Sequence, residues 1–320
     1  MTATSGPANG PSRSTAAVAE TLDPDSSLSW EMAGRWAVYP PLLLVCGATG
    51  MRLLEAMGPR DLAVRDLRAE LARLALLSSL LLLAALLLRA LFQSIEVWGA
   101  GEALALDNLR GVALESRWGG RWRWQVAAAM VAMLGSLAAW RLPGVGLTIT
   151  GAGALGLAAT LPMTGHAFGN PLAWTAQSVH VLGAGFWIGT LIVILVLPLM
   201  VPGTSVAEAA SMRRFWLGAF WPLAIVAATL LVLSGVVLAI LYLPAWNTLW
   251  TEAYGRILLA KVAGSVGVLF LGAVNHLRMN FRPDAHTDPV PLTVALEVAF
   301  ALVVLAATGM LTSTAQPDMH

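Results

Sequence analysis

Long apolar runs recur along the whole sequence and constrain the fold more than any other feature. A helix needs about 20 such residues to cross the hydrocarbon core of a bilayer. Eight runs qualify, at residues 36–56, 72–95, 123–141, 144–162, 172–198, 215–242, 256–277 and 290–312. Only 12% of the residues are charged, against about 25% in soluble domains. The sequence therefore predicts an all-α polytopic membrane protein with eight transmembrane helices.

Two polar segments stand apart from these runs. Residues 1–33 are rich in Ser, Thr, Ala, Gly and Pro, and the segment lacks an apolar core of signal-peptide length. We interpret it as a flexible polar leader, followed by one transmembrane domain at 34–320. The loop 96–122 is too polar to span, and its ALALDNLRGVALES stretch predicts a short helix on the membrane surface.

Arginine is unevenly distributed between the predicted loops. It follows the first, third, fifth and seventh runs, for example at Arg52, Arg141, Arg213 and Arg278. Because cytoplasmic loops are enriched in Lys and Arg, we predict that these loops are cytoplasmic. With eight alternating helices, both chain termini then lie on the outer side.

The motifs of several enzyme classes are absent. The sequence has no Walker A loop, GxSxG elbow or HExxH motif, and the glycines at 151–156 lie in an apolar run without the strand–turn–helix context of a dinucleotide fold. The single cysteine, Cys46, excludes a disulfide framework or a CxxC site. We predict that the protein is not an enzyme and binds neither nucleotide nor nucleic acid.

Two of the five histidines lie in the stretch MTGHAFGNPLAWTAQSVH. His166 falls in a predicted outer loop, and His180 lies about 12 Å inside the next run by the rise of an α-helix. Helical spacing places Gln177, His180, Ala184 and Trp187 on one face. An intramembrane histidine usually faces the protein interior, where it is either a structural hydrogen-bonding residue or a ligand.

A second histidine so close favours a ligand pair. Met163 adds a thioether three residues before His166, and imidazole with thioether suits copper, Cu(I) especially. Met130 and Met310 fall in the outer halves of their predicted helices and are weaker candidate ligands. We therefore predict a copper site formed by His166, His180 and Met163.

Three more residues are candidates for a pathway or relay. His276 lies at the inner end of the seventh run, so it cannot share one haem with His180 near the outer face. Lys261, near the outer end of that run, either snorkels to the interface or lines an outer vestibule as a fixed cation. Glu297 is a candidate proton or cation relay, or the partner of an inner arginine.

Other residues in the runs predict contacts within the bundle. Gly183, Gly185 and Gly189 thin the fifth run and permit close approach of a neighbouring helix. Arg89 and Glu96, one to two turns apart near the outer end of the second run, are expected to pair at the membrane boundary.

Four segments, in order, resemble the CopD family of copper-resistance membrane proteins. The stretch TGHAFGNPLAWTAQSVHVLGAGFWIGTL is similar to that family's signature, in which GHA is followed by LH and W-x-G-x-L. The stretch YGRILLAKVAGSVGVLFLGAVNHLRMN resembles its YGRLLLLK…ALNR helix. SRWGGRWRWQV resembles its entry to a central helix, and GMLTSTAQP its closing LTSxPP. The likeness covers about residues 35–317.

The resemblance implies an eight-helix bacterial inner-membrane protein that handles copper, with a separate periplasmic CopC-like copper-binding protein as partner. It assigns His166 and His180 as the motif histidines. Trp187, Lys261 and Asn275 are further matched positions. NHLR replaces the usual NR pattern, so His276 departs from the family.

Three functions are compatible with the sequence. In the leading hypothesis, copper is received at the outer face by His166 and passed to His180 in the helix bundle without ATP. The alternative is a b-type haem or quinone-linked electron-transfer protein, with His166 and His180 as a conceivable haem pair if the loop folds inward. The third is a structural subunit of a larger membrane complex, in which the histidines form ordinary interior hydrogen bonds.

Overall fold

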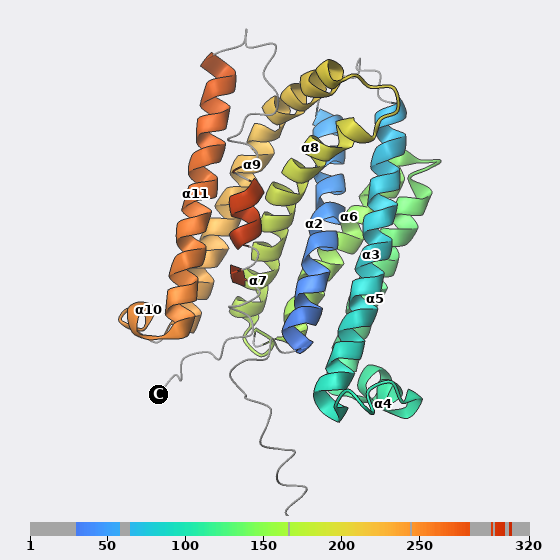
Figure 1. The fold of residues 1–320 in the computed structure, drawn as a ribbon, viewed down its shortest axis with the longest axis vertical. Coiled ribbons are helices and arrows are strands. Elements are labelled where there is room, and N and C mark those ends of the chain that lie inside the picture. The colour runs from blue at the N-terminus through green and yellow to red at the C-terminus, as the bar shows by residue number, and fades with distance from the viewer. Residues whose placement is uncertain are drawn as a thin grey trace, which may run out of the picture.

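The computed structural model of the chain is a bundle of long, roughly parallel helices (Figure 1). It describes residues 30–57, 65–165, 167–243, 245–281, 296, 298–304 and 307–308. Within these ranges there is no β-strand, and six helices are long and apolar enough to cross a membrane. The prediction of an all-α, multi-pass membrane fold is therefore confirmed.

The long elements follow one another in alternating directions through the bundle (Figure 1). They are α2 (Trp30–Met57), α3 (Arg65–Trp98), α5 (Arg117–Ala138), α6 (Pro143–Thr160), one continuous span made of α7 (Pro171–Ala184), η3 (Gly185–Gly189) and α8 (Thr190–Met200), then α9 (Val206–Tyr242) and α11 (Ala253–Phe281). The short connecting elements are α4 (Leu106–Arg110), η1 (Gly111–Glu115), η2 (Leu161–Thr164) and α10 (Thr248–Thr251). We call the end of the bundle that carries α4 and α10 the α4 end.

The eight-helix count stays a prediction. Only parts of the expected run at 290–312 are described, at residues 296, 298–304 and 307–308, and these parts are helical. The expected run at 123–141 corresponds to α5, which begins six residues earlier and is not among the six membrane-spanning candidates. Its first turns contain Arg117, Arg121 and Arg123, which lower the mean hydropathy of the helix. Helix α5 nevertheless packs against α3 and α6 inside the bundle.

Two helix boundaries differ from expectation for local reasons. Helix α9 begins at Val206 rather than near residue 215, because Ser205 and Glu208 form a capping box that starts a helix there. Helix α2 starts at Trp30, inside the predicted leader, and runs through Pro40 and Pro41. Residues 1–29 lie outside the described ranges, so the division into leader and domain stays a prediction.

The segment expected to form a surface helix is helical in two short pieces, α4 and η1. Leu104, Leu106 and Leu114 are exposed, whereas Val112 is buried. Apolar side chains left uncovered on such a segment suit contact with a bilayer surface. Its position on the membrane itself remains a prediction.

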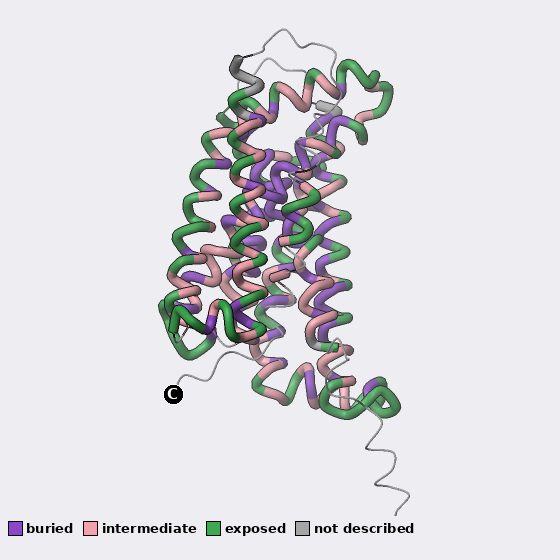
Figure 2. Tube along the Cα trace, turned by 60° about the vertical axis from the view of Figure 1, so that its left-hand side comes forward, coloured by how far each residue is buried: buried purple, intermediate pink, exposed green. Residues whose placement is uncertain are grey.

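Helix α2 lies at the centre of the bundle and contacts α3, α6, η3 and α8. Its side chains Val45, Cys46 and Ala48 are fully buried. Few residues of helices α9 and α11 are buried, and most are exposed or half-buried, which are the green and pink parts of the tube in Figure 2. An apolar helix that is uncovered by protein is suited to face lipid.

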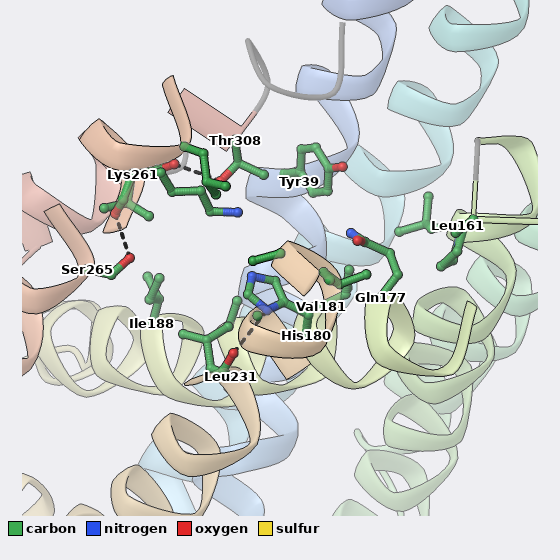
Figure 3. Close-up of a pocket in the computed structure, with 18 of the residues that line it drawn as sticks. Tyr39, Leu161, Gln177, His180, Val181, Ile188, Leu231, Lys261, Ser265 and Thr308 are labelled. Carbon is green, nitrogen blue, oxygen red and sulfur yellow. Dashed lines mark hydrogen bonds between the residues drawn. The ribbon is translucent and has the colours of Figure 1, made fainter. Parts of the chain in front are cut away.

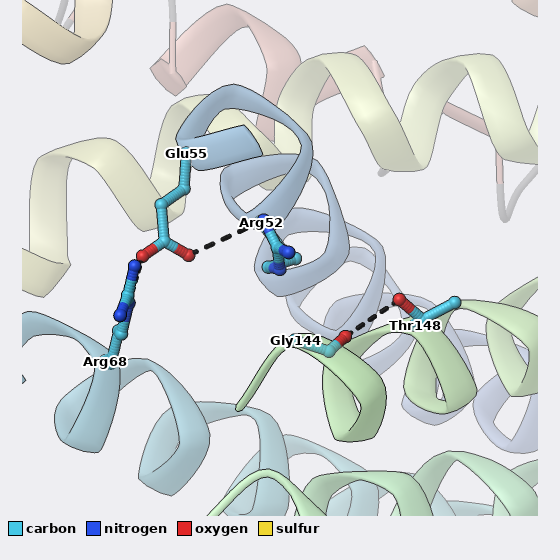
Figure 4. A network of polar contacts seen from close by, with 5 residues as sticks. All are labelled: Arg52, Glu55, Arg68, Gly144 and Thr148. Carbon is cyan, nitrogen blue, oxygen red and sulfur yellow. Dashed lines mark hydrogen bonds and ion pairs between the residues drawn. The ribbon is translucent and has the colours of Figure 1, made fainter. Parts of the chain in front are cut away.

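An ion-pair network joins α2 to α3 at the end of the bundle opposite α4 (Figure 4). The carboxylate of Glu55 contacts the guanidinium of Arg68, and Arg52 Nη1 lies 3.8 Å from Glu55 Oε2. Both arginines belong to the Arg-rich region on which the predicted orientation rests. The contacts hold two successive helices together where the chain reverses.

Candidate functional site

A cavity of about 470 Å³ lies between α2, α7, η3, α9 and α11. Residues near the α4 end of these helices, and Gly165 and Ala167 of the loop before α7, form part of its wall. Most of the wall is aliphatic. The polar side chains that line it include Tyr242 and Tyr254. Tyr39, Gln177, His180 and Lys261 also line it and are labelled in Figure 3.

Helix α7 is placed by strong local signals at its start. Asn170 caps the helix by accepting hydrogen bonds from the backbone amides of Leu172 and Ala173, and Pro171 occupies the first helical position. The indole nitrogen of Trp174 donates to the Ala159 carbonyl 2.8 Å away, which ties α7 to α6. These contacts fix where His180 lies along the bundle.

The imidazole of His180 bridges α7 and α9. Its Nδ1 lies 3.1 Å from the Leu231 carbonyl oxygen and 3.2 Å from Ser234 Oγ. Because a carbonyl only accepts, the contact with Leu231 places a hydrogen on Nδ1 and leaves the lone pair of a neutral ring on Nε2. The ring lines the cavity, and its other nitrogen points toward the side occupied by Lys261 (Figure 3).

Glycine makes room for this ring on the facing helix. A Cβ at Gly235 of α9 would lie 3.2 Å from His180 Cε1, tighter than ordinary contact. The predicted face is also observed, because Gln177, His180, Ala184 and Trp187 all line the cavity. Helical spacing alone was sufficient to identify these four residues as neighbours.

The close helix contacts expected from the glycines of the fifth run are present. A Cβ at Gly183 would lie 2.9 Å from the Ala227 carbonyl of α9, and one at Gly185 would lie 2.7 Å from Cys46 Sγ of α2. The chain forms one π-helical turn, η3, at this place. The sequence did not predict this turn, which often occurs at functional sites.

Lys261 of α11 extends into the cavity from the side opposite α7 (Figure 3). The residue is partly buried, and most of the other residues of the wall are aliphatic. Of the two alternatives from the sequence, this position agrees with a cation that lines a vestibule. Whether it serves copper passage stays a prediction.

Arg89 is a buried member of the site that the sequence did not identify. Its side chain does not pair with Glu96, which is exposed; instead, Nη1 donates to Gln125 Oε1 and Nη2 to Thr164 Oγ1, both at 2.9 Å. The expected boundary pair is therefore wrong, because neighbouring elements present polar groups to Arg89 in the interior. Gln125 Nε2 also donates to the Thr160 carbonyl and to Thr164 Oγ1.

The other predicted ligands lie away from His180 or outside the described ranges. Met163 is in η2, where its carbonyl accepts from Arg121 Nη1, but its side chain is not part of the cavity wall. Met130 is 46% exposed on α5. The sequence could not separate them from His180, because the tertiary packing decides which face of a helix is covered. Met310 is outside the described residues.

His166 and Glu297 lie outside the described residues, as does the side chain of His276. Asn275, near the far end of α11, is buried and does not line the cavity. Within the described part of the chain, no group of three or more His, Cys, Asp or Glu residues could hold a metal ion. His180 therefore contributes one imidazole to the cavity.

Comparison with protein families identifies the class of this bundle. Residues 26–172 match the model "Copper resistance protein D-like, N-terminal domain", and residues 209–311 match the model "Copper resistance protein D". The chain belongs to the copper resistance protein D family. No curated protein and no solved structure matches it.

The two family matches place the cavity in context. The first covers α2 to α6 and reaches the start of α7, and the second covers nearly all of α9 and continues to residue 311. The rest of α7, with His180, lies between the two matches. The walls of the cavity thus come from both matched regions and from the segment that joins them.

Proposed function

We propose that this copper resistance protein moves copper from the outer face into the helix bundle without ATP, using His166 as the receiving residue and His180 as the next one. The observation that carries the proposal is the position of His180. Its Nδ1 is held by the Leu231 carbonyl, which leaves Nε2 for a ligand in the cavity. An imidazole oriented by a second hydrogen bond is the usual arrangement at metal sites.

The cavity wall supports a two-step path. Gly165 and Ala167, the residues on either side of His166 in the sequence, both line the cavity that His180 lines. We expect copper received by His166 to reach His180 through this cavity. Trp187 and Lys261 line the same cavity and are candidates for the pathway.

The proposed location is the bacterial inner membrane, with the α4 end facing the periplasm, where a separate CopC-like protein would deliver copper. The orientation rests on the arginines near the opposite end.

We expect a single cysteine introduced at Gly101, in the exposed loop at the α4 end, to react with a membrane-impermeant maleimide added to intact spheroplasts, once Cys46 is replaced by alanine. A cysteine introduced at Gly203, between α8 and α9, should react only after lysis; the reverse pattern would contradict the orientation.

Replacing His180 by alanine should lower copper accumulation in cells that express the protein at least about tenfold relative to wild type, because metal-site substitutions commonly cost 10- to 100-fold. Mass spectrometry of washed cells measures the copper content, normalised to the amount of protein in the membrane. Ser178→Ala is the matched control, since Ser178 is on the same helix, bonds its hydroxyl to the Trp174 carbonyl and is not part of the cavity wall.

Equal accumulation in the His180→Ala and wild-type cells would refute the transport proposal. A Soret band in the visible spectrum of the purified protein would instead support the haem alternative. Stoichiometric co-purification of other membrane subunits, with no bound metal, would support the structural alternative.

A further inference from the structure

The charges around the cavity are unusual for a site that receives a metal cation. Three of its described lining residues, Arg35, Arg89 and Lys261, carry positive charge at neutral pH, and no described lining residue is Asp or Glu. A bare copper ion beside His180 would therefore meet repulsion from the Lys261 ammonium, which lines the same cavity.

Lys261 is the cation best placed to act on a ligand. Its backbone carbonyl accepts from Ser265 Oγ at 2.9 Å, but its ammonium group has no hydrogen bond or ion pair with any residue that the structure describes. The ammonium extends into the same cavity as the free side of the His180 ring (Figure 3). A charge in such a low-dielectric place is stabilised by a counter-ion.

The size of the cavity also exceeds what a metal ion requires. One water molecule occupies about 30 Å³ of liquid, whereas this cavity measures about 470 Å³. Its volume and mixed lining match those of sites for small organic molecules, which are mostly apolar with a few polar groups. Leu42, Ile188 and Leu269 contribute to the apolar wall.

We infer that copper occupies this cavity together with an anion, the metal on His180 Nε2 and the negative charge of the anion on the Lys261 ammonium. The anion belongs to the class that coordinates copper, either a small organic carboxylate or a halide. It offsets one unit of the copper charge and so makes a cation-lined, apolar cavity suitable for the metal. This inference rests on the proposed function, because it assumes that His180 binds copper.

Neutralising Lys261 distinguishes bare copper from copper bound with an anion, because the change in copper affinity has the opposite sign in the two cases. If bare copper binds, Lys261→Met removes a repulsive charge and copper affinity rises. If the anion accompanies copper, Lys261→Met removes its partner and affinity falls, by about tenfold for a charge-assisted contact. Lys261→Arg keeps the charge and should stay within about threefold of wild type.

The measurement is equilibrium dialysis of copper(II) against the full chain in lipid nanodiscs, with 50 mM propionate as the only coordinating anion. Arg256→Met is the matched control, because Arg256 is an exposed cation near the start of the same helix and does not line the cavity. Its copper affinity should equal that of wild type. Tighter binding by Lys261→Met would overturn the inference.

The anion itself is followed with radiolabelled propionate. We expect copper-dependent retention of about one propionate per copper in wild type and in Lys261→Arg, and none in Lys261→Met. Repeating the dialysis with chloride tests the source: displacement of the label with copper still bound identifies a halide, and retained label identifies a carboxylate. Two results together would overturn the inference. They are copper binding in propionate without retained label, and a copper affinity that is unchanged when perchlorate replaces propionate.

The failure of this inference is distinguishable from failure of the proposed function. If His180→Ala binds copper as wild type does, the proposed function itself fails. If His180→Ala loses copper while Lys261→Met binds it more tightly, the proposed function stands and only the accompanying anion is refuted.

Discussion

Gly189→Ala is expected to destabilise the folded protein by about 3 kcal/mol, at the upper end of the cost of overpacking a core. Gly189 lies in η3, where the backbone packs directly against α2. A Cβ there would overlap the carbonyl oxygen of Leu43 and approach the amide of Gly47 to 3.0 Å. These are backbone atoms, so the overlap can be relieved only if α2 and η3 move apart.

The loss would be measured by reversible unfolding in mixed detergent micelles, titrated with SDS and followed by circular dichroism. Gly218→Ala is the matched control, because Gly218 is an exposed glycine of α9, and a Cβ added there would have no atom within 4 Å. Alanine has the higher helix propensity, so this change should leave stability unchanged or raise it by up to about 1 kcal/mol. Equal stability of the two variants would show that α2 and η3 do not pack this closely.

Arg89→Met should cost about 3 kcal/mol of stability and also lower copper accumulation. Methionine keeps most of the stem that packs near Gly34, but it removes the two donors to Gln125 and Thr164. Hydrogen bonds to charged groups contribute about 1.5–3 kcal/mol each. Thr164 lines the cavity next to Gly165, so loosening this contact should also disturb the loop that contains His166.

The same SDS titration and the cellular copper measurement would test this prediction. Arg110→Met is its control. Among the residues that the structure describes, Arg110 pairs with Glu115 alone, with Nε 3.3 Å from Oε1 and both side chains about two-thirds exposed. Exposed pairs of this kind contribute about 0–1 kcal/mol, so the control should differ little from wild type. A similar loss in both variants would mean that the interior position of Arg89 confers no special stability.

Periodicity identified one face of the site well. The spacing of Gln177, His180, Ala184 and Trp187 predicted a common face, and all four line the cavity. The glycines of the same run predicted close helix contacts, which α2 and α9 provide. Both predictions depend on local helical geometry, which the residues of a single helix determine.

Predictions that required knowledge of a neighbouring helix were weaker. Arg89 was assigned to a boundary pair with Glu96 because the two are close in sequence, but Gln125 and Thr164 come from α5 and η2. A charged arginine inside an apolar run costs free energy unless polar groups surround it. This cost was the one signal in the sequence that Arg89 has partners inside the bundle. Met130 likewise had a suitable depth but is exposed on α5 and does not line the cavity.

The sequence by itself determined the class of the fold and the helix that carries His180, because apolar length, capping residues and helical period are properties of contiguous residues. Only the tertiary structure decided which side chains share the cavity. His180 from α7, Lys261 from α11 and Tyr39 from α2 all line it. Glycines let η3 approach α2, and α7 approach α9, closely. The physical reason is that packing of separate helices depends on the shapes of both surfaces, which no single stretch of the sequence contains.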